Sequence, residues 1–263
     1  MHDNDIFNDI LKKLKETERN NSVKIPLAIE SGSRSWGFAS PDSDYDCRFV
    51  YVHEKDWYLS VFVKPDTIEY AADKVFDVNG WDLRKFISHI VKSNAVMSEW
   101  ISSNEVYIRD EVITALLREL AESFFNPISV SYHYLSLAGK KYKEIINAGS
   151  AKLKSYFYVL RPLANLAYIE QHRKQPPMNY FNTLAEIKLD TAISDEIARL
   201  AEMKESAEES VKIPENKIMT GYFAASIYNY EEKLRAMTYV KNRNYEYADT
   251  MFRKIIEMAW NSE

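Results

Sequence analysis

The sequence predicts an α/β (α+β) fold, in which a small unit that contains the strands is followed by a mostly α-helical domain. Short apolar segments bounded by turn residues, one of them clearly alternating, occupy the chain up to about residue 80. From residue 81 onward, apolar residues recur almost throughout at the spacings of three and four that are typical of helices. The 263 residues include only 6 glycines, which disfavours a loop-rich all-β fold. We therefore predict two domains, residues 1–108 and 109–263.

The first domain is expected to start with a helix and to continue with strands. Apolar residues at helical spacing predict an amphipathic helix over residues 3–19. A short strand over residues 24–30 leads into a Gly-Ser turn and a short helix, and an alternating strand follows over residues 45–52. Further strands are predicted over residues 64–70, entered from a turn, and over residues 74–80, ended by Asn79-Gly80.

The rest of the chain is expected to be helical. The predicted helices cover residues 81–93, 111–125, 128–148, 151–173, 179–189, 194–210 and 222–260. The last of these is long, and we expect a break near Asn242-Arg243-Asn244.

Composition and charge exclude several classes of protein. The net charge of −5 disfavours a nucleic-acid binder held by bulk positive charge, and no reading of a DNA duplex is expected. Cys47 is the single cysteine, so no internal disulfide can form and a reducing compartment is expected. No apolar run approaches the roughly 20 residues that span a bilayer, and the N-terminal residues lack a signal-peptide pattern. We expect a cytoplasmic protein that does not bind membranes.

The segment SGSRSWGFASPDSDYD, residues 31–46, combines features that suit a phosphate and a metal ion. Gly32 lacks a side chain, so its backbone can approach a ligand closely, and Ser33 adds a hydroxyl before the N–H groups of a short helix. Asp44 and Asp46 lie two positions apart on a predicted strand and therefore project from the same face. Paired carboxylates repel each other unless a cation lies between them, and Mg²⁺ (or Mn²⁺) prefers such oxygen ligands. The segment predicts nucleotidyl or phosphoryl transfer.

These residues carry a resemblance to a known family. Gly32-Ser33 followed by Asp44-x-Asp46 resembles the signature of the DNA polymerase β nucleotidyltransferase superfamily. The longer string GSRSWGFASPDSDYDCRFVYV is closer to one branch, the predicted RNA-ligase-associated nucleotidyltransferases of RNA-repair operons and phage genomes. The segments GWDLRKF, KSNAVMSEW, KLKSYFYVLRPLANLAYI and PPM also resemble landmarks of that family. The resemblance covers most of the chain and implies a small mixed-sheet nucleotidyltransferase domain followed by a helical domain that binds substrate or partner.

The resemblance implies a role for each matched residue. Gly32 and Ser33 would hold the triphosphate of an NTP, and Asp44 and Asp46 would bind Mg²⁺. The α-phosphate would then be attacked in line by an acceptor hydroxyl, and pyrophosphate would leave.

The superfamily also uses a third carboxylate on a neighbouring strand, which holds metal or accepts the proton of the hydroxyl. Asp77 is our choice for this catalytic and metal-binding role, because it lies in an apolar strand where an isolated acid is costly. Asp82 is the rival candidate, although it also fits the N-cap of the following helix.

Four basic residues are candidates for nucleotide binding. Arg34 is expected either to contact phosphate through its planar guanidinium or to pair with an aspartate of its own segment. Arg84 and Lys85 either contact the nucleotide or lie on a solvated helix face. Arg161 lies among apolar helix residues and needs a partner, which is either the nucleotide or a buried acid.

A basic cluster interleaved with tyrosines lies further along the chain, at Lys140, Lys141, Tyr142, Lys143, Lys152, Lys154 and Tyr156. Such a cluster either follows an RNA backbone or forms a solvated helix face.

We expect an enzyme that uses Mg²⁺ to transfer a nucleoside monophosphate from an NTP to a hydroxyl, with RNA or tRNA ends as acceptors by family analogy. Two alternatives come from other classes. One is a catalytically silent nucleotide-binding regulator, and the other is a phage-defence or toxin–antitoxin component that acts through a protein partner. Substitution of the aspartates separates them, because it abolishes transfer in the first case, weakens only NTP binding in the second, and spares partner binding in the third.

Overall fold

The computed structural model describes residues 4–70, 76–148 and 150–261, and its contacts divide the chain into two compact units. The first unit comprises Met1–Gly32, Asp44–Phe124 and Asn242–Glu263. The second unit comprises Ser33–Ser43 and Phe125–Lys241. Each unit is described by itself below.

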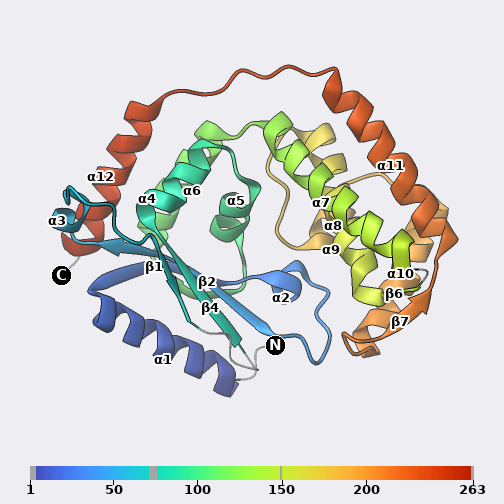
Figure 1. Cartoon of the computed structure of the whole chain (residues 1–263), viewed down its shortest axis with the longest axis horizontal. Helices are drawn as coiled ribbons and strands as arrows, with labels where there is room; N and C mark the ends of the chain where they lie inside the picture. The colour runs from blue at the N-terminus through green and yellow to red at the C-terminus, as the bar shows by residue number, and fades with distance from the viewer. Residues whose placement is uncertain (1–3, 71–75, 149, 262–263) are drawn as a thin grey trace. The chain divides into compact units, whose positions relative to one another are not determined.

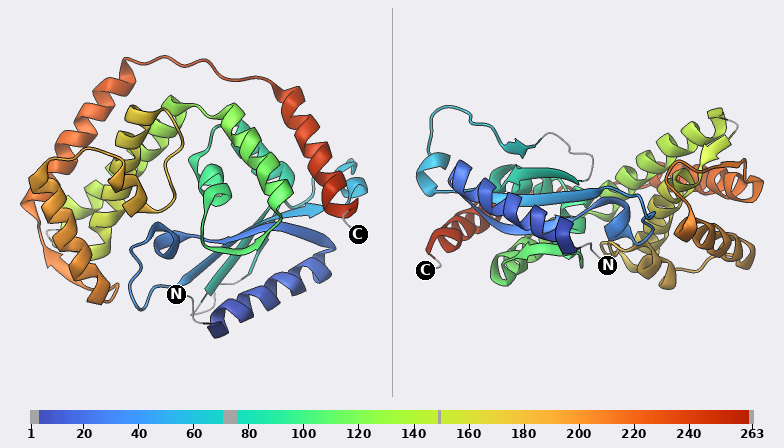
Figure 2. Two further views of the ribbon diagram at one scale, coloured as in Figure 1. Left: turned by 180° about the vertical axis from the view of Figure 1, so that it is seen from behind. Right: turned by 90° about the horizontal axis from the view of Figure 1, so that it is seen from below.

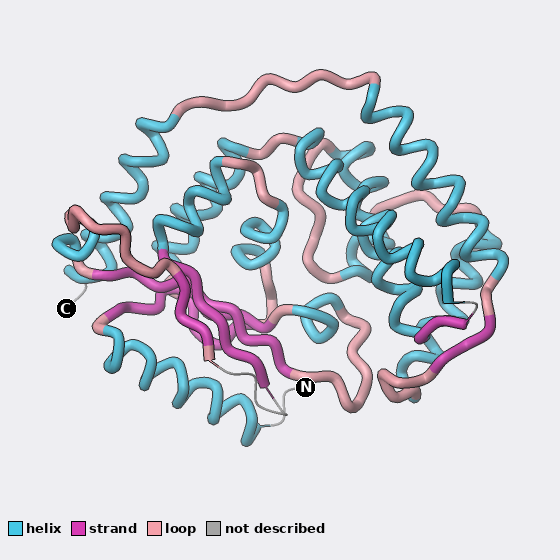
Figure 3. The backbone as a smooth tube through the Cα atoms, in the orientation of Figure 1, coloured by secondary structure: helices cyan, strands magenta, loops and turns pink. Residues whose placement is uncertain are grey.

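A five-stranded mixed sheet forms the centre of the first unit (Figure 3). Its strands are β1 (Val23–Glu30), β2 (Tyr45–His53), β3 (Thr67–Glu69), β4 (Phe76–Asp82) and β5 (Val106–Arg109), in the spatial order β3-β4-β2-β1-β5. β2 and β4 run parallel, and the other neighbouring pairs are antiparallel. The α/β fold class and the strands that were predicted around residues 24–30, 45–52 and 64–70 are confirmed.

Helices lie on both sides of this sheet. The helices of the first unit are α1 (Asn4–Asn21), α3 (Lys55–Tyr58), α4 (Leu83–Val91), α5 (Ala95–Ser102), α6 (Glu111–Phe124) and α12 (Tyr245–Asn261). α1 packs against one face, whereas α4, α6 and α12 contact strands from the other side (Figure 1). When the molecule is viewed from below, α1 crosses in front of the strands (Figure 2).

The pleat of β2 decides which of its side chains are buried beneath α1. Tyr45, Cys47 and Phe49 belong to the core cluster that also contains Ile10 and Leu14 of α1. Side chains of a strand alternate between its two faces, so the intervening Asp46 and Arg48 project from the opposite face.

β4 is longer than predicted at its C-terminal end. Instead of ending at Asn79-Gly80, it continues to Asp82, because Gly80 and Trp81 pair with β3 on one side and with β2 on the other. Helix α4 accordingly begins at Leu83 rather than at residue 81. Lys74 and Val75, the first residues of the predicted strand, lie outside the described residues.

β5 lies between the predicted helices over residues 81–93 and 111–125, where the sequence predicted no strand. Its four residues, VYIR, are too few to show an alternating pattern, and the strand forms because it pairs with the edge of β1. The predicted boundary near residue 108, between an α/β domain and a helical domain, stays a prediction. In the described units, however, α6 and α12 pack on the first sheet although they follow that boundary in the chain.

The second unit is mostly helical, as the sequence predicted. Its elements are α7 (Pro127–Ala148), β6 (Ser150–Lys152), α8 (Leu153–His172), α9 (Tyr180–Ala185), α10 (Thr191–Ser206), β7 (Lys212–Pro214) and α11 (Lys217–Arg235). α7 and α8 pack along each other, and α11 contacts both. The antiparallel pair of β6 and β7 was not expected, because each strand has only three residues. The break that was predicted near residues 242–244 is confirmed between α11 and α12.

The short predicted helix after the Gly-Ser turn is also confirmed. It is α2 (Gly32–Trp36), which begins at the junction between the two units. The segment that follows it belongs to the second unit and is anchored there by Phe38, which is 4% exposed. The Phe38 ring stacks on Phe157 of α8 at 5.3 Å between ring centroids and meets Tyr180 of α9 edge-on at 5.9 Å. Among the described helices, none combines the length and the apolarity needed to cross a bilayer.

One prediction concerns the response of the first unit to acid. The His53 ring stacks on Trp57 at 3.8 Å, and burial together with nearby Lys64 lowers the pKa of His53 to about 4. In the unfolded chain the pKa is near 6.5, so between these values the unfolded state binds more protons. We expect the stability that depends on neutral His53 to be complete above about pH 6.5 and to be lost as the pH falls toward 4. The measurement is thermal unfolding of the wild-type protein and of His53→Phe between pH 7 and pH 4. The variant keeps a ring at this position but cannot be protonated, so its stability should depend less steeply on pH. An unchanged slope in that variant contradicts the prediction.

Candidate active site

Asp46 and Asp77 lie side by side on the parallel strands β2 and β4. The strand register pairs Asp46 directly with Asp77. Nη2 of Arg48 lies 3.1 Å from Oδ1 of Asp46 and 2.8 Å from Oδ2 of Asp77, so one guanidinium nitrogen bridges both carboxylates. These acids are about one-third exposed, at 35% and 36% of their side-chain surfaces. The structure therefore brings together two predicted metal ligands that are 31 residues apart in the chain.

The backbone of Asp46 is held in place by the end of β1. Oε1 of Glu30 accepts a hydrogen bond from the Asp46 N–H at 2.9 Å, and the Ser31 N–H donates to the Asp46 carbonyl at 2.9 Å. The other oxygen of Glu30, Oε2, accepts from the Tyr107 hydroxyl at 2.5 Å. Glu30 is completely buried, so its carboxylate positions Asp46 rather than contacting solvent. Sequence reasoning missed Glu30, although a carboxylate that ends an apolar strand directly before the Gly-Ser turn was a usable signal.

Gly32 passes close to the Asp46 carboxylate. Its φ is +64°, in the left-handed region that glycine adopts without strain. A Cβ atom at this position would lie 2.3 Å from Oδ2 of Asp46. Asp46 thus directs Oδ1 toward Arg48 and Oδ2 toward the Gly32 backbone. The Gly-Ser turn and the Asp-x-Asp strand are in direct contact at this point.

Replacing Gly32 with alanine is expected to damage this arrangement in two ways. The positive φ is strained for a residue with a Cβ, and the methyl group must displace the Asp46 carboxylate. We expect nucleotidyl transfer to fall by at least about tenfold, with a loss of about 1–2 kcal/mol in the free energy of unfolding. Transfer kinetics and denaturant unfolding measure the two effects separately. Wild-type kinetics in Gly32→Ala would show that the position of the Asp46 carboxylate does not matter.

The electrostatics of the site favour a bound cation. Burial raises the pKa of the Asp46 carboxyl above its ordinary value, Arg48 opposes this rise, and the nearby charges of Asp77 and Asp44 add to it. Asp44 is exposed and lies immediately before β2, two positions from Asp46. Arg48 therefore offsets only part of the effect that burial and the neighbouring acids have on the Asp46 carboxyl.

Comparison with known proteins identifies the family of the chain. The family model of the RNA repair pathway DNA polymerase beta family matches residues 6–254. The chain belongs to this family. The Uncharacterized protein YcgL of Bacillus subtilis (strain 168) is 40% identical over 200 residues, which are 76% of this chain and 77% of that protein. A nucleotidyltransferase-like protein from Exiguobacterium sibiricum 255-15 has 10% identity and a TM-score of 0.32, covering 86% of this chain and 75% of that structure.

Membership in the RNA repair pathway DNA polymerase beta family confirms the family that the sequence motifs resembled. It also supports a role in nucleotidyl transfer, because the family is polymerase-β-like.

Asp82 was the alternative to Asp77 as the third carboxylate of this polymerase beta family member. Asp82 lies at the C-terminal end of β4, whereas Asp77 lies near its start. Its Oδ1 accepts the Arg84 N–H at 2.8 Å and thereby caps α4, and its Oδ2 accepts the Tyr58 hydroxyl at 2.8 Å. Asp82 pairs with Tyr51 in the strand register and is 1% exposed. Burial raises its pKa, and the bonds from Tyr58 and Arg84 oppose that rise. The bond from the Arg84 N–H is the N-cap contact that the sequence suggested for Asp82.

Arg84 and Lys85 follow Asp82 and are not brought to the paired carboxylates. Nη2 of Arg84 donates to the Tyr58 carbonyl at 2.9 Å, and its guanidinium lies 5.0 Å from the Tyr58 ring centroid. Nζ of Lys85 pairs with Asp66 at 3.1 Å. Asp77 and Asp82 are separated by about 16 Å of strand, at roughly 3.3 Å per residue. The assignment of Arg84 and Lys85 to the nucleotide stays a prediction from sequence.

Ser33 and Arg34 begin the segment that belongs to the second unit. Oγ of Ser33 donates to Oγ of Ser43 at 3.2 Å, and Nη2 of Arg34 donates to the Ser43 carbonyl at 2.6 Å. The Ser43 hydroxyl in turn donates to Oε1 of Glu209 at 2.9 Å, and Glu209 forms an ion pair with Lys154. The two ends of the segment are thus tied together and to the helical unit. Glu209 and its contact to Ser43 had no signal in the sequence.

Arg161, the remaining predicted nucleotide ligand, lies on α8 and is 5% exposed. Its guanidinium lies 4.1 Å from the ring centroid of Trp36, which is also within edge-to-face distance of Tyr158. One turn along α8, Asn165 is 1% exposed, and neither polar atom of its side chain has a hydrogen-bond partner among the described residues. Trp36 acts here as a packing anchor, and a nucleotide role for Arg161 stays a prediction.

Proposed function

We propose that the protein is a Mg²⁺-dependent nucleotidyltransferase that moves a nucleoside monophosphate from an NTP to the hydroxyl of an RNA end. The observation that carries the proposal is the direct pairing of Asp46 with Asp77 across β2 and β4, with one Arg48 nitrogen between their oxygens. Family membership supports the reaction type, and the RNA acceptor follows from the family description alone.

The residues present fit a magnesium ion by their chemistry. Carboxylate oxygens are the ligands that Mg²⁺ prefers, and this ion is usually held by one or two carboxylates together with substrate phosphates. Within residues 4–70, 76–148 and 150–261, no group of three or more aspartate, glutamate, histidine or cysteine side chains is placed so that it could hold a metal ion without rearrangement. Oδ2 of Asp46, directed toward Gly32, is not the oxygen that Arg48 holds. Asp44, Asp46 and Asp77 would be the protein ligands.

A metal ion bound there would neutralise the triphosphate and lower the pKa of the acceptor hydroxyl. Gly32 and Ser33 would lie along the triphosphate, where the absence of a side chain at Gly32 permits close approach. Asp77 would hold the acceptor oxygen in line and take its proton. That oxygen forms a bond to the α-phosphorus as the bond to the bridging oxygen breaks, and pyrophosphate leaves with the electron pair.

The test uses α-³²P-labelled NTPs with Mg²⁺ or Mn²⁺ and RNAs that end in a 3′-hydroxyl or a 3′-phosphate. Label should pass to the 3′-hydroxyl RNA with wild-type protein and not with Asp44→Asn plus Asp46→Asn. The double variant Asp9→Asn plus Asp56→Asn removes two exposed acids elsewhere and should transfer label normally.

Label on a small molecule or on protein would keep the chemistry and overturn the RNA acceptor. NTP binding with no transfer to RNA, protein or small molecule would overturn the enzyme and favour the regulator. Transfer that persists in the Asp44 and Asp46 double variant would overturn the assigned site.

A further inference from the structure

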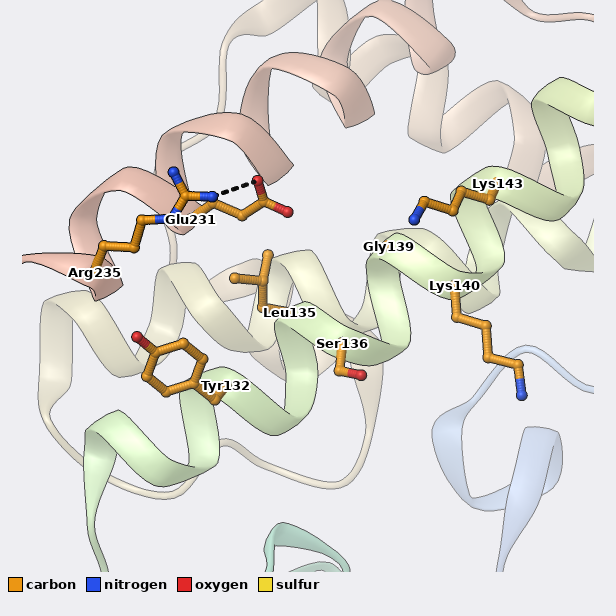
Figure 4. A pocket seen from close by; sticks show the side chains of 8 residues that line it. All are labelled: Tyr132, Leu135, Ser136, Gly139, Lys140, Lys143, Glu231 and Arg235. Carbon is orange, nitrogen blue, oxygen red and sulfur yellow. Dashed lines mark ion pairs between the residues drawn. The ribbon is translucent and has the colours of Figure 1, made fainter.

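A groove between α7 and α11 in the helical unit contains unpaired positive charge. It has a volume of about 550 Å³ and is lined by Tyr132, Leu135, Ser136, Gly139, Lys140, Lys143, Glu231 and Arg235 (Figure 4). Three cations face a single carboxylate there, in a chain whose net charge is −5. A local basic groove on an acidic protein favours a specific anionic ligand over general attraction.

The two lysines supply most of the available charge. Lys140 and Lys143 are both exposed, and within the part of the chain that the structure describes neither forms an ion pair. Their neighbour Lys141, in contrast, pairs with Glu144 at 2.8 Å. Arg235 lies 2.7 Å from Glu232 and 4.0 Å from Glu231, so its charge is already partly compensated. Figure 4 shows the Lys143 side chain on the side of α7 that faces α11, whereas the Lys140 side chain extends from α7 away from α11.

The opposite end of the groove has an aromatic surface. The Tyr132 side chain is 44% exposed, and its hydroxyl donates to the Leu234 carbonyl of α11 at 3.0 Å. This bond fixes the ring at the groove wall instead of leaving it mobile in solvent. Tyr132 and Lys143 lie eleven residues apart on α7, which corresponds to about 16 Å along the helix. Small residues, Ser136 and Gly139, lie between them and keep the groove open.

We propose that this groove, which we call the α7–α11 groove, binds the backbone of single-stranded RNA and holds the acceptor. The inference rests on the proposed function for its acceptor class. Single-stranded nucleic acids are held by a basic groove that follows the phosphates, together with aromatic rings on which bases stack. The α7–α11 groove offers both features in one line along α7. Lys140 and Lys143 contact phosphates, and the ring of Tyr132 stacks on a base.

The test measures fluorescence anisotropy of a labelled single-stranded RNA with the full chain carrying Asp44→Asn and Asp46→Asn, so that no turnover occurs. Lys140→Ala plus Lys143→Ala should weaken binding by about tenfold and reduce the slope of log K against log salt by about 1.4. Lys12→Ala plus Lys15→Ala is the matched control, since these lysines are also exposed and three residues apart on a helix. This control should bind within about twofold of the parent protein.

The aromatic end is tested by a second pair of variants. Tyr132→Ala should weaken binding by about tenfold, whereas Tyr132→Phe keeps the ring and should bind within about twofold of the parent. The proposal would be overturned if the Lys12 and Lys15 control lost as much RNA affinity as the Lys140 and Lys143 variant. It would also be overturned if poly-glutamate of equal charge displaced the RNA, and this result would favour an acidic protein partner.

The experiments distinguish a failure of the groove proposal from a failure of the proposed function. Lysine-dependent RNA binding without transfer by the wild-type protein would retain the groove and overturn the transferase. If the wild-type protein transfers label to RNA and the Lys140 and Lys143 substitutions leave this transfer unchanged, the transferase is retained and the groove proposal is overturned.

Discussion

Asp77→Asn is expected to reduce nucleotidyl transfer by about 10³-fold while the protein stays folded. Asp77 lies beside Asp46 in the strand register and shares Arg48 with it, so in the proposed function it would be the third carboxylate of the metal site. Loss of one such ligand removes several kcal/mol of charge stabilisation from the transition state, at 1.36 kcal/mol per tenfold in rate. Its side chain is 36% exposed, so the free energy of unfolding should change by less than about 1 kcal/mol.

Asp82→Asn is the matched control and should behave in the opposite way. The Asp82 carboxylate accepts bonds from the Arg84 N–H and the Tyr58 hydroxyl, and an amide cannot accept both in the same geometry. We expect a loss of about 1–2 kcal/mol in stability with metal-dependent transfer retained. Single-turnover transfer and urea unfolding of both variants distinguish the two acids. A thousandfold loss of transfer in Asp82→Asn, with Asp77→Asn active, would reverse the assignment of the third carboxylate.

Gly80→Ala is expected to be the most destabilising small substitution in the sheet. A Cβ at Gly80 would lie 2.1 Å from Cε2 of Phe49 and within 2.6 Å of two further ring atoms. Phe49 is completely buried and pairs with Gly80 across β2 and β4, so the ring has no space into which to move. Overpacking of this kind costs about 1–3 kcal/mol, and we expect the upper end of that range.

Two companion variants show whether the ring is responsible. Phe49→Leu combined with Gly80→Ala should be more stable than the sum of the single effects, by about 1 kcal/mol or more. Gly221→Ala is the control, since a Cβ there meets no atom within 4 Å and the residue lies within α11. That substitution should be neutral or stabilising by about 0.5–1 kcal/mol. Strict additivity of Phe49→Leu and Gly80→Ala would exclude the steric explanation.

Much of the candidate site was predictable from local pattern. The strand period of two predicted Asp44 and Asp46 on one face, and in the structure Asp46 lies in β2 while Asp44 lies immediately before it. The turn at Gly32-Ser33 followed from glycine's conformational freedom, which the φ of +64° at Gly32 requires. Helical spacing likewise predicted the second unit, because 3.6-residue periodicity depends only on neighbours along the chain.

Other features depend on which segments meet in space. The sequence favoured Asp77 over Asp82 by composition, but the parallel register of β2 and β4 is what places Asp77 beside Asp46 and leaves Asp82 to cap α4. The bond from Asp46 to buried Glu30, the contact of Gly80 with Phe49, and the return of α12 to the first sheet all join residues that are remote in the chain. Periodicity is set by covalent neighbours and is visible in the sequence, whereas strand pairing is selected by the total burial and hydrogen bonding of the folded chain.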